Sequence, residues 1–216
     1  MFAGTKEFIE ERLKLQPVAT RVMDHPVPRH ITWLHCFGGL TFFTFIIQVV
    51  TGIMMAFFYI PSPDHATDSV AYLQTSVPFG SIVRNLHRWG AYAMVTLVFF
   101  HMVRVFVHKA YRKPRELNWV LGVVLIMLVL GFGFTGYLLP WDQKAYWATN
   151  VGLNIVGTIP FVGKTAANFL RGGVELGALT LVRFYALHVF ILPVVLVAGM
   201  LLHFAMIRKQ GIAEPL

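Results

Sequence analysis

Four histidines in two apolar stretches have the spacing of a paired metal-binding arrangement. Those of the first stretch are fourteen residues apart and those of the second are fifteen apart: His87 and His101, then His188 and His203. In an α-helix, with 100° and 1.5 Å per residue, the two members of each pair face roughly one way and lie about 21 to 22 Å apart. On two parallel helices, the first members share one depth and the second members share another. Imidazoles on both faces of a flat cofactor suit two bis-histidine haems.

Four glycines repeat the same period in two other apolar stretches. Gly38 and Gly52 are fourteen residues apart, and so are Gly122 and Gly136. Glycine lets a backbone approach a flat cofactor closely, so these positions predict the same two layers as the histidines. Each residue type also has an ordinary alternative, because histidine on an apolar helix is often a hydrogen-bonded polar group and membrane glycine is usually a packing residue. The agreement between the two patterns favours the cofactor.

Four apolar segments are long enough to carry these residues across a membrane. The chain has 216 residues, of which 56% are hydrophobic and 13% charged, too apolar for an ordinary soluble domain. A membrane helix needs about 20 apolar residues. We therefore predict an all-α integral membrane protein, a four-transmembrane-helix bundle that binds haems. The helices are expected over about 31–60, 84–109, 117–141 and 183–207 of a transmembrane domain covering 31–216, after an amphipathic surface segment over 1–30.

The basic residues orient this bundle. They gather in the N-terminal segment, in the connection between the second and third helices and in the C-terminal tail, whereas the first connection, residues 61–83, has no Lys or Arg. The net charge of +8 therefore indicates a membrane side and not a nucleic-acid surface. The positive-inside rule places both termini on the cytoplasmic or equivalent side, the n side. The second and fourth helices then both run from the opposite p side toward the n side.

Several motifs resemble those of one membrane protein family. They are HRW at 87–89, KPRELNW at 113–119, GYLLPWDQ at 136–143, RFYALH at 183–188 and IRKQG at 207–211. From about residue 10 to residue 216 the chain resembles the b-type cytochromes of quinol-oxidising cytochrome bc complexes, and more narrowly their short, split b6 form. The fifteen-residue histidine spacing and Cys36 in HCFGG favour that form. A Pro-Glu-Trp-Tyr motif, which a separate subunit carries in split systems, is absent from this sequence.

The resemblance implies an electron-transfer subunit that works in a Q-cycle and is inactive alone. Quinol near the p side gives one electron to an iron–sulfur protein and the other to a p-side haem held by His87 and His188. An n-side haem, held by His101 and His203, then serves quinone reduction near the n side. Protons are released on the p side and taken up on the n side. The implied cofactors are two haem b, one haem c covalently attached at Cys36, and quinone as substrate.

The resemblance also implies further site residues and partners. Arg84 and Arg88 are expected to pair with p-side haem propionates, and Arg115 and Arg208 with n-side ones, although the positive-inside rule also accounts for such residues. The expected partners are a subunit IV-like chain with the acidic quinol-site motif, a Rieske iron–sulfur protein and a c-type cytochrome, in a dimeric complex within the lipid bilayer. No nucleic acid is expected. The location is a bacterial cytoplasmic or thylakoid-type membrane, and the loop sequences favour a bacterial complex.

Two other functions are compatible with paired histidines. A di-haem membrane anchor of a quinone-linked dehydrogenase has a similar arrangement, but the RELNW, LPWDQ and IRKQG motifs argue against it. In a haem-free transport protein, the histidines would line a proton path, and an absorption spectrum of the reduced protein distinguishes that case. The five other histidines are interpreted as interfacial, with no role assigned: His25, His30, His35, His65 and His108.

Overall fold

Four helices in the computed structural model, which describes residues 31–212, are long and apolar enough to cross a membrane. They are α3 (Cys36–Ala56) after the short turn η1 (Trp33–His35), α5 (Gly80–Val107), α6 (Glu116–Leu138), and one continuous helix formed by α9 (Ala178–Ala186), η2 (Leu187–Ile191) and α10 (Leu192–Gln210). The predicted four-helix membrane bundle is confirmed. The amphipathic segment predicted over 1–30 lies outside the described residues.

The membrane helices differ from the predicted segments mainly at their ends. α5 begins at Gly80, four residues before the predicted start, and the fourth helix begins at Ala178, not near residue 183. With 28 residues, α5 is about 42 Å long, more than the hydrocarbon core of about 30 Å. α3 and α6, in contrast, end before the predicted residues 60 and 141, so the apolar segments locate the helices but not their ends.

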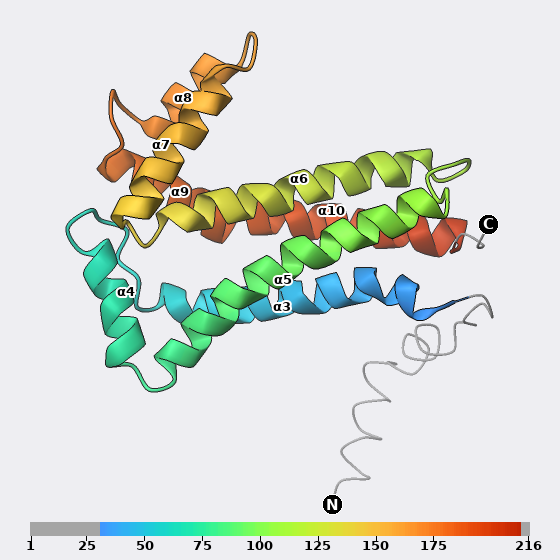
Figure 1. Cartoon of the computed structure of the whole chain (residues 1–216), viewed down its shortest axis with the longest axis horizontal. Coiled ribbons are helices and arrows are strands. Elements are labelled where there is room, and N and C mark those ends of the chain that lie inside the picture. The colour runs from blue at the N-terminus through green and yellow to red at the C-terminus, as the bar shows by residue number, and fades with distance from the viewer. Residues whose placement is uncertain (1–30, 213–216) are drawn as a thin grey trace, which may run out of the picture. The chain divides into compact units, whose positions relative to one another are not determined.

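The connections at one end of the bundle contain helices of their own. α4 (Ala66–Thr75) joins α3 to α5, while α7 (Gln143–Gly157) and α8 (Gly163–Arg171) lie between α6 and α9. Figure 1 shows these three helices together at the end opposite the C-terminus. We call this the α7 end, and we call the end with residues 108–115 and residue 212 the C-terminal end. Asp142 begins α7 by accepting a hydrogen bond from the Ala145 N–H at 2.8 Å.

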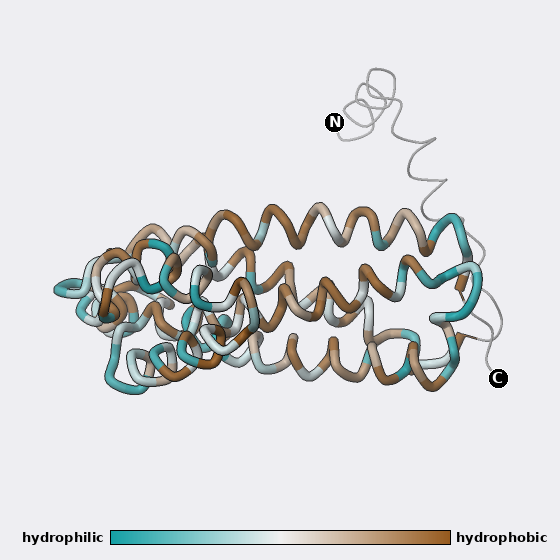
Figure 2. The backbone as a smooth tube through the Cα atoms, turned by 90° about the horizontal axis from the view of Figure 1, so that it is seen from above, coloured by the Kyte–Doolittle hydropathy of each residue, from teal (hydrophilic) through white to brown (hydrophobic). Residues whose placement is uncertain are grey.

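The bundle consists of two helix pairs, because α3 packs along α5 and α6 packs along α10. Buried apolar side chains from all four helices meet midway along it: Phe45, Met94, Leu125, Val129 and Leu196. Most other large apolar side chains on these helices are exposed, as a lipid-facing surface requires. Figure 2 shows hydrophobic residues along the middle of the long helices and hydrophilic ones gathered toward both ends.

Candidate cofactor site

The structure brings the four predicted histidines together in two pairs. Toward the α7 end, His87 on α5 faces His188 on η2, with ring centroids 6.2 Å apart. Toward the C-terminal end, His101 on α5 faces His203 on α10 at 6.5 Å. An imidazole nitrogen lies about 2 Å from a metal that it ligates and about 1 Å from its own ring centre, so two rings on opposite sides of one metal have centroids about 6 Å apart. Both pairs thus have the separation that one metal between them requires.

A π-helical segment brings His188 and His203 into register. In η2 the Leu192 N–H bonds to the carbonyl five residues earlier, and one such turn takes up an extra residue. The fifteen-residue spacing therefore matches the fourteen residues that separate the histidines of α5. Pro193 directly follows this π turn, near the start of α10. Proline lacks an N–H and clashes with the carbonyl four residues back, which favours this wider turn.

Each of the four predicted glycines lies against one of the imidazole rings. A Cβ built on a glycine would approach Cε1 of the facing histidine in four pairs: Gly136–His188 at 2.5 Å, Gly38–His101 at 3.0 Å, Gly52–His87 at 3.3 Å and Gly122–His203 at 3.9 Å. The sequence predicts that these glycines admit a flat cofactor, but the group they directly admit is the imidazole ring. The glycines of α3 contact the histidines of α5, and the glycines of α6 contact the histidines of η2 and α10. Each helix pair therefore positions two imidazole rings by contacts within the pair.

Two threonines that the sequence analysis does not select orient the first histidine pair. Thr51 Oγ1 lies 2.9 Å from Nδ1 of His87, and Thr135 Oγ1 lies 3.1 Å from Nδ1 of His188. Each hydroxyl donates its hydrogen to a carbonyl four residues earlier in its own helix, so it accepts from the imidazole N–H. A proton on Nδ1 leaves the Nε2 lone pair for a metal. The sequence signal was a Thr-Gly dipeptide at 51–52 and again at 135–136.

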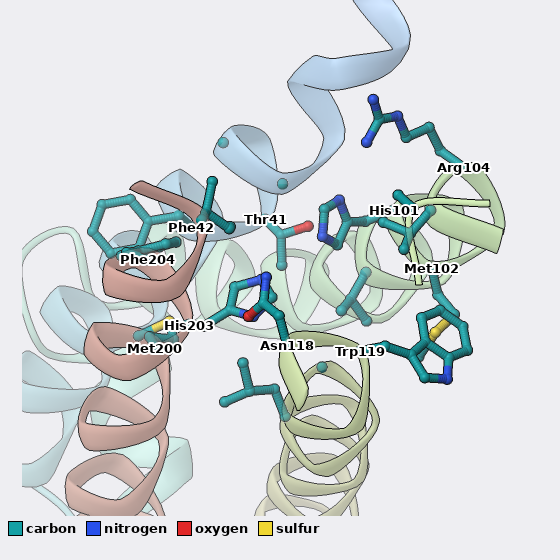
Figure 3. A pocket seen from close by; sticks show the side chains of 18 of the residues that line it. Thr41, Phe42, His101, Met102, Arg104, Asn118, Trp119, Met200, His203 and Phe204 are labelled. Carbon is teal, nitrogen blue, oxygen red and sulfur yellow. The ribbon is translucent and has the colours of Figure 1, made fainter. Parts of the chain in front are cut away.

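A cavity surrounds the second pair at the C-terminal end (Figure 3). His101 and His203 line it together with the predicted Arg115 and with two residues that the sequence analysis misses, Arg104 and Asn118. Nε and Nη2 of Arg104 and Oδ1 of Asn118 are buried without a hydrogen-bond partner. Buried polar groups need partners, so the cavity suits a ligand that carries acceptors for the guanidinium. The signal for Arg104 was its position three residues after His101, on the same helix face.

The arginines predicted beside the first pair lie at the α7 end. Arg84 donates a hydrogen bond to Gln74 on α4. Arg88 is exposed on α5. These positions are near the end of the membrane helix, where a long side chain reaches the interface. The structure thus places both arginines at the predicted end of the bundle, and their pairing with a cofactor stays a prediction.

The residues predicted beside the second pair are spread over three helix ends. Arg115 donates to the carbonyls of Gln210 and Gly211, which joins the start of α6 to the end of α10. Arg208 is exposed in the last turn of α10. Cys36 is an exposed free thiol at the first residue of α3. Of these three predicted residues, Arg115 lines the cavity.

A half-buried tyrosine joins two segments of the chain at the α7 end. The hydroxyl of Tyr59, just beyond α3, donates to the Leu139 carbonyl at 2.6 Å, and its ring stacks on Tyr185 with centroids 5.4 Å apart. Burial, and secondarily the neighbouring Tyr185 phenol, raises the pKa of Tyr59 above its ordinary value. The protonated hydroxyl donates the hydrogen bond that connects the first loop to the end of α6.

The two layers fit haems better than bare metal ions. In residues 31–212, no group of three or more His, Cys, Asp or Glu side chains could hold a metal ion. Two imidazoles alone would hold a metal ion only weakly, whereas a haem bound here would supply the remaining ligands of the metal. Haem carboxylates would also match the unpartnered guanidinium of Arg104. The donor set present therefore fits one haem at each pair.

The chain is similar over nearly its whole length to cytochromes of one family. The sequence model of the family described as cytochrome b/b6/petB matches residues 22–211. Identity is 47% over 218 residues to the menaquinol:cytochrome c reductase cytochrome b subunit of Geobacillus thermodenitrificans, covering 97% of each chain. It is also 47%, over 210 residues, to cytochrome b6 of Gracilaria tenuistipitata var. liui, covering 97% of this chain and 98% of that one. A solved chain titled "Hyperthermophilic respiratory Complex III" matches with a TM-score of 0.89 at 31% identity, and the match covers 97% of this chain but 56% of the solved one.

Replacing Gly136 by alanine is expected to remove the haem of the first pair, because the new Cβ would lie 2.5 Å from Cε1 of His188. The haem b content of the purified protein, measured by redox difference spectroscopy, should fall by about half. Gly133→Ala on the same helix is the matched control, since its Cβ would meet nothing within 4 Å. Equal haem content in the two variants would contradict the close-approach argument.

Deleting Val189 from the π segment is expected to leave both haems bound, because the spacing of His188 and His203 becomes fourteen residues, as in α5. Deleting Val197 instead, in the regular part of α10, keeps the π turn and rotates His203 by about 100° relative to His188. That variant should lose the haem of the second pair. Low-temperature electron paramagnetic resonance separates the two low-spin signals, and loss of the same signal in both deletions would refute the register argument.

Proposed function

The chain belongs to the cytochrome b/b6 family and is a b subunit of the quinol-oxidising bc/b6f type, and we propose that its two histidine layers hold two haem b groups. Family membership argues against the dehydrogenase anchor and the haem-free transporter. The observation that carries the proposal is the facing of two imidazole pairs at 6.2 and 6.5 Å. Two haems bound there would supply one-electron redox chemistry, while the protein supplies binding, orientation and electrostatics.

The residues around each layer have distinct tasks in this proposal. Thr51 and Thr135 hold the first pair of rings in the tautomer that presents Nε2. At the second pair, Arg104 and Asn118 receive the polar edge of the cofactor, and the missing partners of the guanidinium become carboxylate oxygens. Arg84 and Arg88, and on the other side Arg115 and Arg208, add positive charge at the interface for the remaining propionates.

The two ends of the bundle serve different quinone reactions in a Q-cycle. We assign quinol oxidation to the α7 end, the p side, where the GYLLPWDQ motif leads from α6 into the capped start of α7. Quinone reduction belongs at the C-terminal end, the n side, where the cavity around His101 and His203 lies. Both termini then lie on the n side.

The oxidation site needs other subunits. The acidic quinol-site motif is absent from this sequence, so a subunit IV-like chain would complete the pocket. A Rieske iron–sulfur protein and a c-type cytochrome would accept the electrons that leave on the p side, within a dimeric complex. In this arrangement the isolated chain has no quinol oxidase activity.

The ligand roles of the histidines are tested by single substitutions. His87→Ala and His188→Ala should each abolish the haem of the first pair, and His101→Ala and His203→Ala that of the second, because iron left with one axial ligand faces an apolar slot. His65→Ala, an exposed residue before α4, is the control and should keep both haems. Haem content and the two low-spin resonance signals give the outcome. Two haems in all four variants would exclude the pairing.

We also propose that Cys36 carries one haem c through a single thioether. The thiol is free and exposed, and it begins α3 two residues before Gly38, whose Cα lies against the ring of His101. A denatured sample run on a gel and stained for haem peroxidase activity reveals covalently retained haem only. The wild-type chain should stain and Cys36→Ser should not, while both keep two extractable haem b groups. An unstained wild-type band, with the maturation machinery present, would reduce Cys36 to a packing residue.

A further inference from the structure

A third pair of histidines lies at the C-terminal end, outside the two cofactor layers. His35 is the last residue of η1 and His108 directly follows α5, and their ring centroids are 5.8 Å apart with planes inclined at 74°. The two cofactor pairs have separations of 6.2 and 6.5 Å and inclinations of 67° and 82°. The third pair thus has nearly the same mutual geometry as the two pairs that hold metal in the proposed function, although the Q-cycle uses neither residue.

The hydrogen bonding of His108 prepares it to bind a metal. Its Nδ1 lies 3.0 Å from the carbonyl oxygen of Arg104, one turn earlier in α5. A carbonyl accepts only, so Nδ1 carries the proton and donates, and the lone pair of Nε2 is left for a ligand. Metal-binding histidines usually have this second hydrogen bond, and Thr51 and Thr135 provide it in the first cofactor layer.

The location of the pair links it to the cavity. His35 lines the same cavity as His101 and His203, whereas His108 is half-buried beside it. Two imidazoles bound to one ion at a tetrahedral angle have centroids about 5 Å apart, and in a linear arrangement about 6 Å. The observed 5.8 Å lies between these limits, so the separation of the two rings fits one ion between them.

We propose that His35 and His108 bind an exchangeable divalent transition-metal ion at the mouth of this cavity. Imidazole nitrogen suits copper, zinc and nickel, whereas magnesium and calcium prefer oxygen. Within the described part of the chain no third side chain completes a ligand set, so water fills the other positions and the ion stays exchangeable. The nearby cations Arg104 and Lys109 oppose any divalent ion equally, and among these ions Cu²⁺ has the greatest affinity for nitrogen ligands.

The test is a Cu²⁺ titration of the purified, oxidised complex, followed by electron paramagnetic resonance. One equivalent per chain should give a copper spectrum split by two imidazole nitrogens. His35→Gln and His108→Gln should each remove one nitrogen and weaken binding by roughly tenfold or more, since even loss of an outer hydrogen-bond partner costs that much. Zn²⁺ should displace the copper when added in excess.

Two control variants keep the result interpretable. His65→Gln, exposed at the α7 end, should bind Cu²⁺ as the wild type does. Cys36→Ser tests the neighbouring sulfur, and loss of the copper signal in that variant would assign the ion to Cys36 and overturn the proposal. Unchanged binding in the double variant His35→Gln/His108→Gln would overturn it as well. The haem of the first layer, held by His87 and His188 at the other end of the bundle, reports the folding of each histidine variant.

Discussion

The arrangement of the whole chain depends on one requirement, that four imidazole rings face each other in two pairs across a gap of about 6 Å. A glycine stands behind each of these four rings, and at His188 and His101 an added Cβ would lie only 2.5 and 3.0 Å from Cε1 of the ring. The gap also separates the two helix pairs. Consequently the bundle has strong contacts within each pair, α3 with α5 and α6 with α10, and its central core lies between the two layers.

The two layers are supported in different ways. In the layer near the α7 end, both rings bond to threonines on the partner helix, and the helices of the connections close that end. At the C-terminal layer, Nδ1 of His203 has no hydrogen-bond partner. The cavity around it contains unpartnered donors on Arg104 and an unpartnered acceptor, Oδ1 of Asn118. Protein hydrogen bonds therefore fix the ring orientations in the layer near the α7 end, whereas the polar groups of the C-terminal layer depend more on a bound ligand for their partners.

The sequence predicts the regular part of this design well. The length of the apolar segments predicts the four helices. The period of His87 and His101, matched by the glycines, predicts both layers, because a repeat of about four helical turns is visible in the residue order. Other features leave a weaker trace. The π turn is invisible, since fifteen residues fit either a rotated α-helix or a widened one. Thr51 and Arg104 look ordinary in a sequence, because their roles depend on which partner helix or cavity they face.

The apolar cluster between the layers has an electrical consequence. Phe45, Met94 and Leu196 belong to a dry, weakly polarisable slab that separates the two histidine depths by about 21 Å, roughly two thirds of a hydrocarbon core of about 30 Å. A membrane voltage falls mainly across such a slab. Each electron transferred from one depth to the other then works with or against about two thirds of the applied voltage, about 1.5 kcal/mol per 100 mV. Because these apolar side chains separate the two depths, the membrane potential acts directly on electron transfer between them.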